Sequence, residues 1–226
     1  MSLSGSLGKR LAPRITEIAP GLTTSFVREA LSRAIDGVGP LPGAAAAADK
    51  QLKEQHGNVE RAIHELIENH VRYAGAQGFL TNVGGLVTAA FTIPANITGL
   101  TLMQCRMIAG IAHLRGHDLS DPRVRNAILT TLLGEEVVNR LVQKQKLPAP
   151  PMALATAPAH DVNLDAIISA EVAADLIARV AGKRLATTVG RRVPVIGGLV
   201  GMGADGYATW KVGRYADREI LPRRRG

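Results

Sequence analysis

A run of 33 residues without a charged side chain, from Tyr73 to Cys105, most constrains how this chain can fold. A helix that spans a membrane needs about 20 predominantly apolar residues, so the run is long enough for one span. Its composition argues against a simple span, because Pro94 interrupts it and polar threonine and asparagine residues are scattered through it. The run predicts two shorter helices instead, roughly 76–92 and 95–115, joined at the sequence TIPAN.

A helical hairpin of this kind can dip into one leaflet of a membrane or pack against the rest of the protein. A second glycine-rich apolar stretch, VIGGLVGMGADGYATW, follows Pro194. Asp205 interrupts this stretch, and we expect it on a helix surface facing water, because a lone carboxylate at lipid depth would be costly. Glycine lets neighbouring helices approach closely, and four residues are candidates for such packing: Gly84, Gly85, Gly197 and Gly201.

The spacing of apolar residues is helical along most of the chain. No segment alternates polar and apolar residues between hairpin turns. We therefore expect an all-α protein, a compact helical domain with two glycine-rich apolar helical hairpin segments. Asn58 is a predicted helix N-cap, and Asp121 followed by Pro122 predicts a second helix start. Gly116 is expected to end the helix before it.

Glycine and proline residues suggest how the chain is divided. We assign residues 1–42 to an N-terminal helical extension and linker, and residues 43–218 to a helical domain. Four prolines in LPAPPMALATAPAH predict an extended linker at 147–160 within that domain. Residues 219–226 are expected to form a basic disordered tail.

The net charge of +8 is concentrated in the last quarter of the chain. Residues 1–178 carry 16 basic and 16 acidic residues, whereas residues 179–226 carry 11 basic and 3 acidic residues. This bias favours an anionic partner, with a solvated basic end as the alternative. No recognisable nucleic-acid motif accompanies it, so we expect lipid rather than nucleic acid. The predicted head-group contacts are Arg184, Arg191, Arg192, Arg214 and Arg218.

The usual signatures of catalysis are missing from the sequence. Neither a nucleophile elbow nor a Walker-type phosphate loop is present. Cys105 is the single cysteine and lies in an apolar helix, so we interpret it as a core residue in a reducing compartment. The weak candidates for a metal site are His113, His117, Asp118 and Asp121. We predict no catalytic residue, no cofactor and no metal.

Two blocks of sequence resemble the EcsC protein family. The first is AGAQGFLTNVGGLVTAAFTIPANITGL followed by QCRMIAGIAHLRGHDLSDPRVR, and the second is RRVPVIGGLVGMGADGYATWKVGRYA. The resemblance covers roughly residues 55–218 and implies a bacterial helical protein, but it assigns no catalytic residue. The chain departs from the family pattern at His117, where tyrosine is frequent. This departure argues against a site shared by the family that is formed by His113 and His117.

Three functions fit these features. The first is a non-catalytic helical protein that associates peripherally with the cytoplasmic membrane, and the second is a soluble scaffold or partner-binding module. The third is a metal-dependent enzyme that acts on a lipid. We favour the first, at the inner membrane, with anionic lipid or a membrane protein as partner and homo-oligomers as a further possibility. Its predicted membrane contacts are Phe79, Leu80, Leu86, Phe91, Ile93, Pro94, Tyr207 and Trp210.

Overall fold

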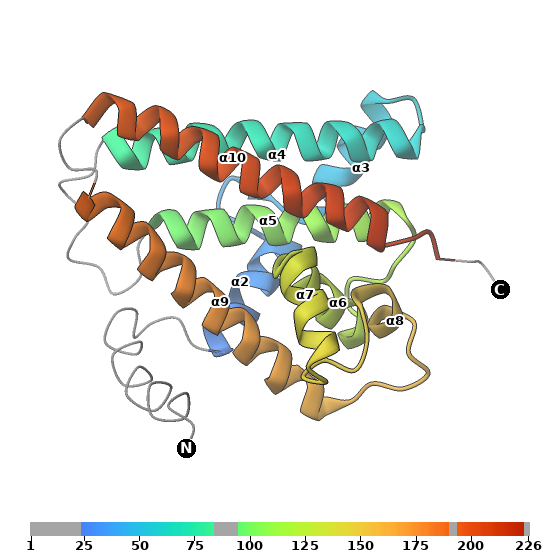
Figure 1. Ribbon diagram of the computed structural model, residues 1–226. Helices are drawn as coiled ribbons and strands as arrows, with labels where there is room; N and C mark the ends of the chain where they lie inside the picture. Colours follow the sequence, from blue (N-terminus) through green and yellow to red (C-terminus); the bar gives the residue numbers. More distant parts are fainter. Residues whose placement is uncertain (1–23, 84–94, 190–193, 224–226) are drawn as a thin grey trace, which may run out of the picture.

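Figure 1 presents the computed structural model of the chain. It describes residues 24–83, 95–189 and 194–223, with side chains described over 24–76, 99–179 and 203–223. Apart from one antiparallel pair of two-residue strands, the regular structure of these residues is helical, which confirms the all-α prediction. In chain order the elements are α2 (Thr24–Asp36), β1 (Gly37–Val38), β2 (Leu41–Pro42), α3 (Ala44–Glu54), α4 (Val59–Val83), α5 (Ala95–Leu114), α6 (Pro122–Leu132), α7 (Glu135–Gln143), α8 (Pro151–Ala155), α9 (Val162–Val189) and α10 (Pro194–Glu219).

Helix α5 lies at the centre of the fold (Figure 1). It contacts α2, α3, α4, α6 and α10. Met107, Ile108 and Ile111 on this helix are all fully buried. Aromatic residues make up only 3% of the chain, so close packing of aliphatic side chains forms most of the core.

Helices α4 and α10 form the most extensive helix–helix contact of the described chain and lie side by side in Figure 1. They run antiparallel, because Gly213 lies against Ile67 whereas Gly206 lies against Val71 and Gly75. A Cβ atom on Gly213 would be 2.9 Å from Cγ2 of Ile67, which is closer than side chains tolerate. Glycine at this position therefore sets the distance between the two helices.

The predicted hairpin is correct in its second helix and wrong in its first. Helix α5 begins at Ala95 and ends at Leu114, close to the expected 95–115. No separate helix begins at residue 76, because α4 starts at Val59 and continues to Val83. The loss of charge after Arg72 changes the composition of this helix but does not break its backbone hydrogen bonding.

The predicted helix ends are confirmed by their hydrogen bonds. Asn58 Oδ1 accepts the backbone N–H of Arg61 at 3.0 Å and so caps α4. Asp121 caps α6 in the same way, with Pro122 in the first helical position. Helix α5 ends in a Schellman motif, in which the N–H of His117 donates to the carbonyl of Ala112 at 3.0 Å. Gly116 within this motif has a φ of 81°, a conformation that glycine adopts without strain.

The segment 147–160, which we expected to be an extended linker, contains helix α8 and packs against α6. Leu147 and Leu154 are buried, at 1% and 5% exposure. Pro151 occupies the first turn of α8, where a missing N–H costs no helical hydrogen bond. The expectation was wrong because the prolines start a helix here, and the apolar residues between them reach the core.

Segments assigned to the two ends of the chain also join the core. Helix α2 packs against α5 and α9, and its Val27 is fully buried. At the other end, Ile220 is 3% exposed and the N–H of Arg223 donates to the carbonyl of Arg115 at 2.9 Å. The prediction of disorder is therefore wrong for residues 219–223, which dock on the end of α5.

Replacing Gly213 by valine should separate α4 from α10. The new side chain would collide with Ile67 and Met107, so we expect the free energy of unfolding to fall by about 2 kcal/mol or more. Gly203→Val is the matched control, because a Cβ atom on Gly203 meets nothing within 4 Å. Both variants place the same β-branched residue in α10, so urea denaturation isolates the packing cost. Equal stability of the two variants would contradict the close approach at Gly213.

Candidate functional site

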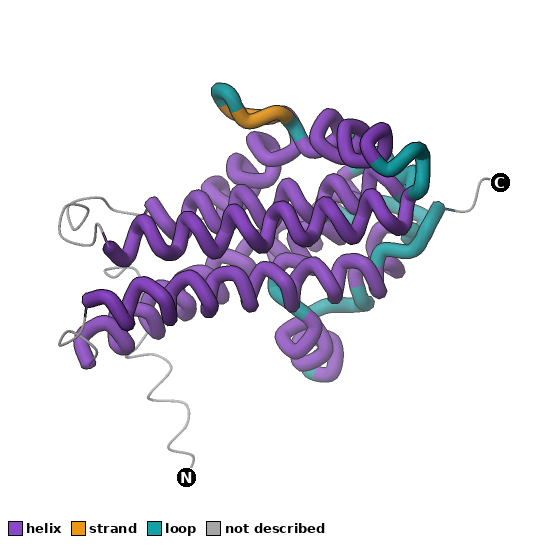
Figure 2. Tube along the Cα trace, turned by 90° about the horizontal axis from the view of Figure 1, so that it is seen from above, coloured by secondary structure: helices purple, strands orange, loops and turns teal. Residues whose placement is uncertain are grey.

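Four helix ends lie at the same end of the molecule. Figures 1 and 2 show that the C-terminal ends of α4 and α9 and the N-terminal ends of α5 and α10 all reach this end. We call it the four-helix end and define it by Val83, Ala95, Val189 and Pro194. It brings together the two glycine-rich segments, which are far apart in the sequence.

The sequence at the four-helix end is poor in charge. Residues 77–98 contain no Asp, Glu, Lys or Arg. Residues 180–202 contain four basic residues and no acidic residue. Across the described chain, none of the helices is both long enough and apolar enough to span a membrane.

The side chains of most of the predicted contact residues lie outside the described residues. They are the membrane contacts Phe79, Leu80, Leu86, Phe91, Ile93 and Pro94, the head-group contacts Arg184, Arg191 and Arg192, and the packing glycines Gly84, Gly85, Gly197 and Gly201. Among the described glycines, Gly206 and Gly213 bring α10 close to α4. These two were not among our candidates, although they continue the glycine pattern of the second stretch.

The other two predicted membrane contacts, Tyr207 and Trp210, lie on the exposed face of α10. Their exposed fractions are 62% and 42%. Their rings stack with centroids 5.9 Å apart and 17° between the ring planes. An exposed pair of this kind combines apolar ring faces with polar edges, a combination typical of interfaces.

The basic residues of this face of α10 lie next to acidic residues. Arg218 donates to Oε2 of Glu135 at 2.5 Å, and Arg214 lies 3.4 Å from Oδ2 of Asp217. Lys211 makes a similar pair with helix α7. These pairs partly neutralise the two residues that we predicted to bind head groups from this face.

Asp205 does not face water as we expected, because its side chain lies in the interior and the residue is only 2% exposed. Its neighbours on α10 explain the difference. Gly206 and Thr209 face α4 and α5, so the side of α10 that carries Asp205 is turned into the core. The expectation failed because it treated one helix as isolated.

The two histidines considered as metal ligands have other partners. Nε2 of His113 lies 2.8 Å from Oδ1 of Asp49, which ties α5 to α3. Nε2 of His117 donates to the carbonyl of Leu221 at 2.8 Å, which ties the end of α5 to the residues after α10. Both histidines therefore connect helices.

The two aspartates shape the turn between α5 and α6. Asp118 accepts the N–H and the hydroxyl of Ser120 at 2.9 and 2.7 Å, and these hydrogen bonds lower the pKa of its carboxyl group. Asp121 caps α6 and pairs with Arg123, whose hydrogen bonds lower the Asp121 pKa. Within the described parts of the chain, no three His, Cys, Asp or Glu side chains gather as metal ligands would.

Arg115 is the most connected residue at the opposite end from the four-helix end. It is 8% exposed, and its guanidinium donates to the carbonyls of Asp217 and Ile220 and to Oδ1 of Asp217, the last at 2.7 Å. A longer contact of 3.4 Å reaches Glu60 at the start of α4. One side chain thus fastens α4, α5 and α10 together. The sequence pointed to its neighbours His113 and His117 but not to Arg115, because the acceptors of Arg115 are remote in sequence.

Other polar residues are buried between α4, α5 and α10. Gln104 donates to the hydroxyl of Thr209 at 3.1 Å, with both residues almost fully buried. His70 is 2% exposed, and its Nδ1 donates to the carbonyl of Leu66 at 2.7 Å. Burial lowers the pKa of His70 to about 4, with the nearby charge of Arg106 adding to the effect, so its imidazole is neutral at pH 7. Among the residues that the structure describes, its Nε2 atom has no hydrogen-bond partner.

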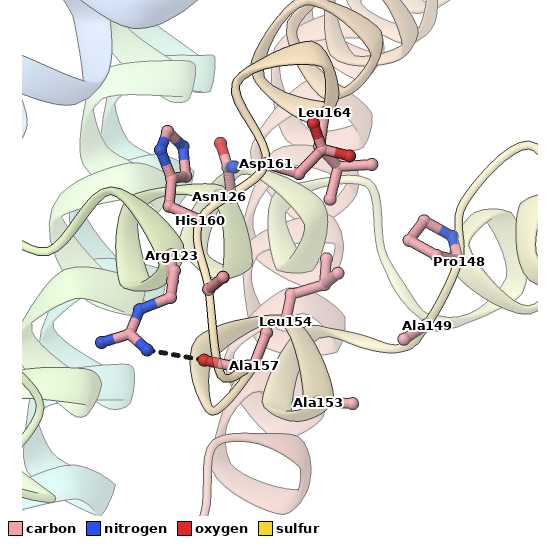
Figure 3. Close-up of a pocket in the computed structure, with 11 residues that line it drawn as sticks. Arg123, Asn126, Pro148, Ala149, Ala153, Leu154, Ala157, His160, Asp161 and Leu164 are labelled. Atoms are coloured by element: carbon pink, nitrogen blue, oxygen red, sulfur yellow. Dashed lines mark hydrogen bonds between the residues drawn. The ribbon is translucent and has the colours of Figure 1, made fainter.

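A cavity of 210 Å³ lies away from the four-helix end, between α6, α8 and the start of α9 (Figure 3). Its charged and polar lining residues are Arg123, Asn126, His160 and Asp161. Arg123 also donates to the carbonyl of Ala157 at 2.6 Å. Its guanidinium is therefore engaged with the protein itself on two sides.

The polar residues behind this cavity connect three helices. Asp165 accepts hydrogen bonds from Asn126 at 2.7 Å and from Nε2 of His160 at 2.8 Å, and Arg28 lies 3.6 Å away. Partial burial opposes ionisation of Asp165, yet these hydrogen bonds and the Arg28 charge together hold its pKa below the usual value. This network joins α2, α6 and α9 beside the cavity.

The fold defines a class of protein. It is all-α, with α5 at its centre, the antiparallel pair of α4 and α10 beside it, and a four-helix end whose sequence is poor in charge. The model of the EcsC protein family matches residues 6–224. The chain therefore belongs to the EcsC protein family, and the match extends beyond the two blocks that carried the sequence resemblance. No curated protein and no solved structure matches the chain.

Arg115→Met should destabilise the fold strongly. The substitution leaves the buried carbonyls and the Asp217 carboxylate without their donor, so we expect a loss of about 3 to 5 kcal/mol in the free energy of unfolding. Arg214→Met is the matched control, because its side chain is 44% exposed and its pair with Asp217 is long, so the loss should be below about 0.5 kcal/mol. Chemical denaturation measures both, and similar losses would rule out Arg115 as the fastening residue.

His70 should make the protein sensitive to acid. Its folded pKa of about 4 lies below the unfolded value of 6.5, so the unfolded chain binds the proton more tightly. The stability it contributes is complete above pH 6.5 and is lost as the pH falls toward 4. Between pH 7 and 4.5, His70→Gln should lose about 2 to 3 kcal/mol less than the parent protein. His64→Gln, on the exposed face of α4, is the control for the loss of a histidine from this helix.

Proposed function

We propose that this EcsC family member is a non-catalytic helical protein that associates peripherally with the cytoplasmic membrane and binds anionic lipid through its four-helix end. The observation that carries the proposal is the convergence of four helix ends, which unites the two glycine-rich apolar segments. A single apolar segment would be a common core feature. The meeting of two such segments at one end supports a shared binding surface there.

The distribution of charge supports anionic lipid as the partner. Residues 180–202 supply Lys183, Arg184, Arg191 and Arg192 with no acidic residue among them. By contrast, Arg214 and Arg218 on α10 each lie beside a carboxylate. A basic residue near an anionic membrane contributes about 1 kcal/mol, so the residues without acidic neighbours in sequence should contribute most.

Flotation with liposomes tests the proposal. The protein should float with vesicles that contain phosphatidylglycerol at low salt, and high salt should release part of it, because screening weakens the attraction. Arg191→Gln with Arg192→Gln should weaken binding about thirtyfold, from two contributions of about 1 kcal/mol each. Arg214→Gln with Arg218→Gln removes the same charge from the ion-paired positions and should have a clearly smaller effect.

Two results would change this assignment. A protein that remains in solution with every lipid would reject membrane binding and favour the scaffold or partner-binding module. Flotation with neutral phosphatidylcholine at the same level would show that charge is not required, and apolar contact would then carry the binding.

A further inference from the structure

One side of α10 is exposed along a continuous stripe. Its members follow each other at intervals of three or four residues, so they lie on one face of the helix. We call this face the α10 stripe, and it consists of Gly203, Tyr207, Trp210, Arg214 and Arg218, all of which are exposed. The opposite side of α10, which carries Gly206 and Thr209, packs against α4 and α5. The described part of the fold therefore leaves the stripe uncovered.

The stacked rings of Tyr207 and Trp210 form the centre of the α10 stripe. Each ring limits the movement of the other, because the centroids are 5.9 Å apart and the planes are nearly parallel. A pair held in this way presents a flat apolar surface and loses little side-chain freedom when it binds. Exposed tyrosine and tryptophan are enriched at the centres of protein–protein interfaces. The pair therefore has the chemistry of a protein contact.

The charges on and beside the stripe cancel among the described side chains. Three basic residues each have an acidic partner, so the surface has both signs and no excess of either. The pairs are Lys211 with Glu136, Arg214 with Asp217, and Arg218 with Glu135, at 2.9, 3.4 and 2.5 Å. Anionic lipid and nucleic acid are attracted by excess positive charge, which this face lacks. A partner with both signs of charge around an apolar centre fits it better.

The order of residues along the stripe makes it complementary to an antiparallel copy of itself. A two-fold axis at the level between Ala208 and Thr209 places Tyr207 of each copy opposite Trp210 of the other. The same register places Gly203 opposite Arg214, which leaves room for the long side chain. The two Arg214 residues then lie on opposite sides of the axis, about 16 Å apart along the helices.

A parallel pairing of two stripes lacks this complementarity. It would place Arg214 opposite Arg214 and Arg218 opposite Arg218, and like charges in contact oppose association. The antiparallel register is therefore the one in which aromatic rings meet and positive charges are kept apart.

From these features we propose that two copies of this chain associate through their α10 stripes, antiparallel, with Tyr207 and Trp210 at the centre of the contact. The four-helix ends then point to opposite extremities of the dimer, since Pro194 begins α10 in each copy. Neither end is covered by the contact. The inference goes beyond the proposed function and does not depend on it.

Sedimentation velocity of the full chain, from micromolar to millimolar concentration, tests the association. The parent protein should shift from monomer to dimer as its concentration rises. Tyr207→Ala and Trp210→Ala should each raise the dissociation constant at least about thirtyfold, because each residue lies at the centre of the contact and occurs there twice. Both side chains are exposed, and circular dichroism establishes that the variants are folded.

Tyr73→Ala is the matched control. Tyr73 and Tyr207 are the same residue type with the same exposed fraction of 62%. Val71 and Gly75 of α4 face α10, so Tyr73, two residues from each, points away from it. Its replacement should leave the dissociation constant unchanged.

Disulfide cross-linking tests the antiparallel register. A mixture of Gly203→Cys and Arg214→Cys chains should form covalent dimers under mild oxidation, whereas Arg214→Cys alone should not. The native Cys105 is buried and so does not compete. A Cβ atom on Gly203 meets nothing within 4 Å of its own chain, so the new cysteine fits the fold.

Four results would overturn the inference. They are a protein that stays monomeric to millimolar concentration, a dimer that neither alanine variant weakens, and a dimer that Tyr73→Ala weakens equally. The fourth is cross-linking of Arg214→Cys with itself in place of the mixture, which would show a parallel contact. Flotation is measured on the same variants. Loss of liposome binding in Trp210→Ala without a change in association would assign the stripe to lipid and also overturn the dimer, whereas a parent protein that forms the dimer but does not float would reject only the proposed function.

Discussion

The antiparallel contact between α4 and α10 is the constraint on which the rest of the molecule depends. Gly206 and Gly213 allow α10 to approach α4, and this approach covers the apolar face that α4 presents through Ile67 and Val71. The same contact turns Asp205 and Thr209 inward and leaves Tyr207 and Trp210 outward. The lack of a side chain at Gly206 and at Gly213 thus determines which residues of α10 are buried and which face solvent.

This contact also gives the molecule two unlike ends. At one end short hydrogen bonds of Arg115 and His117 join α5 to α10 and the residues after it, and a longer contact of Arg115 reaches Glu60 of α4. At the other end the same helices finish in sequence that has almost no charge. The polar contacts that fix the described part of the bundle are therefore concentrated at the end where α5 and α10 meet.

Local signals in the sequence predicted the helix boundaries that local hydrogen bonds create. Asn58, Asp121 and Gly116 were recognised because capping and C-terminal motifs depend on a few adjacent residues. The continuation of α4 past Tyr73 was missed because a change in charge resembles a boundary without being one. The burial of Asp205 and the role of Arg115 were missed because both depend on partners on other helices, and one sequence does not reveal that pairing.

The separation of α4 from α10 in the chain has a consequence for synthesis. Gly213 is added 146 residues after Ile67, which at about 5 to 20 residues per second takes about 7 to 30 s. During that time the face of α4 that later receives α10 has no partner from its own chain. The nascent protein therefore exposes this apolar face of α4 until α10 is complete. A ribosome that stalls ahead of α10 would leave a fragment prone to aggregate or to bind chaperones.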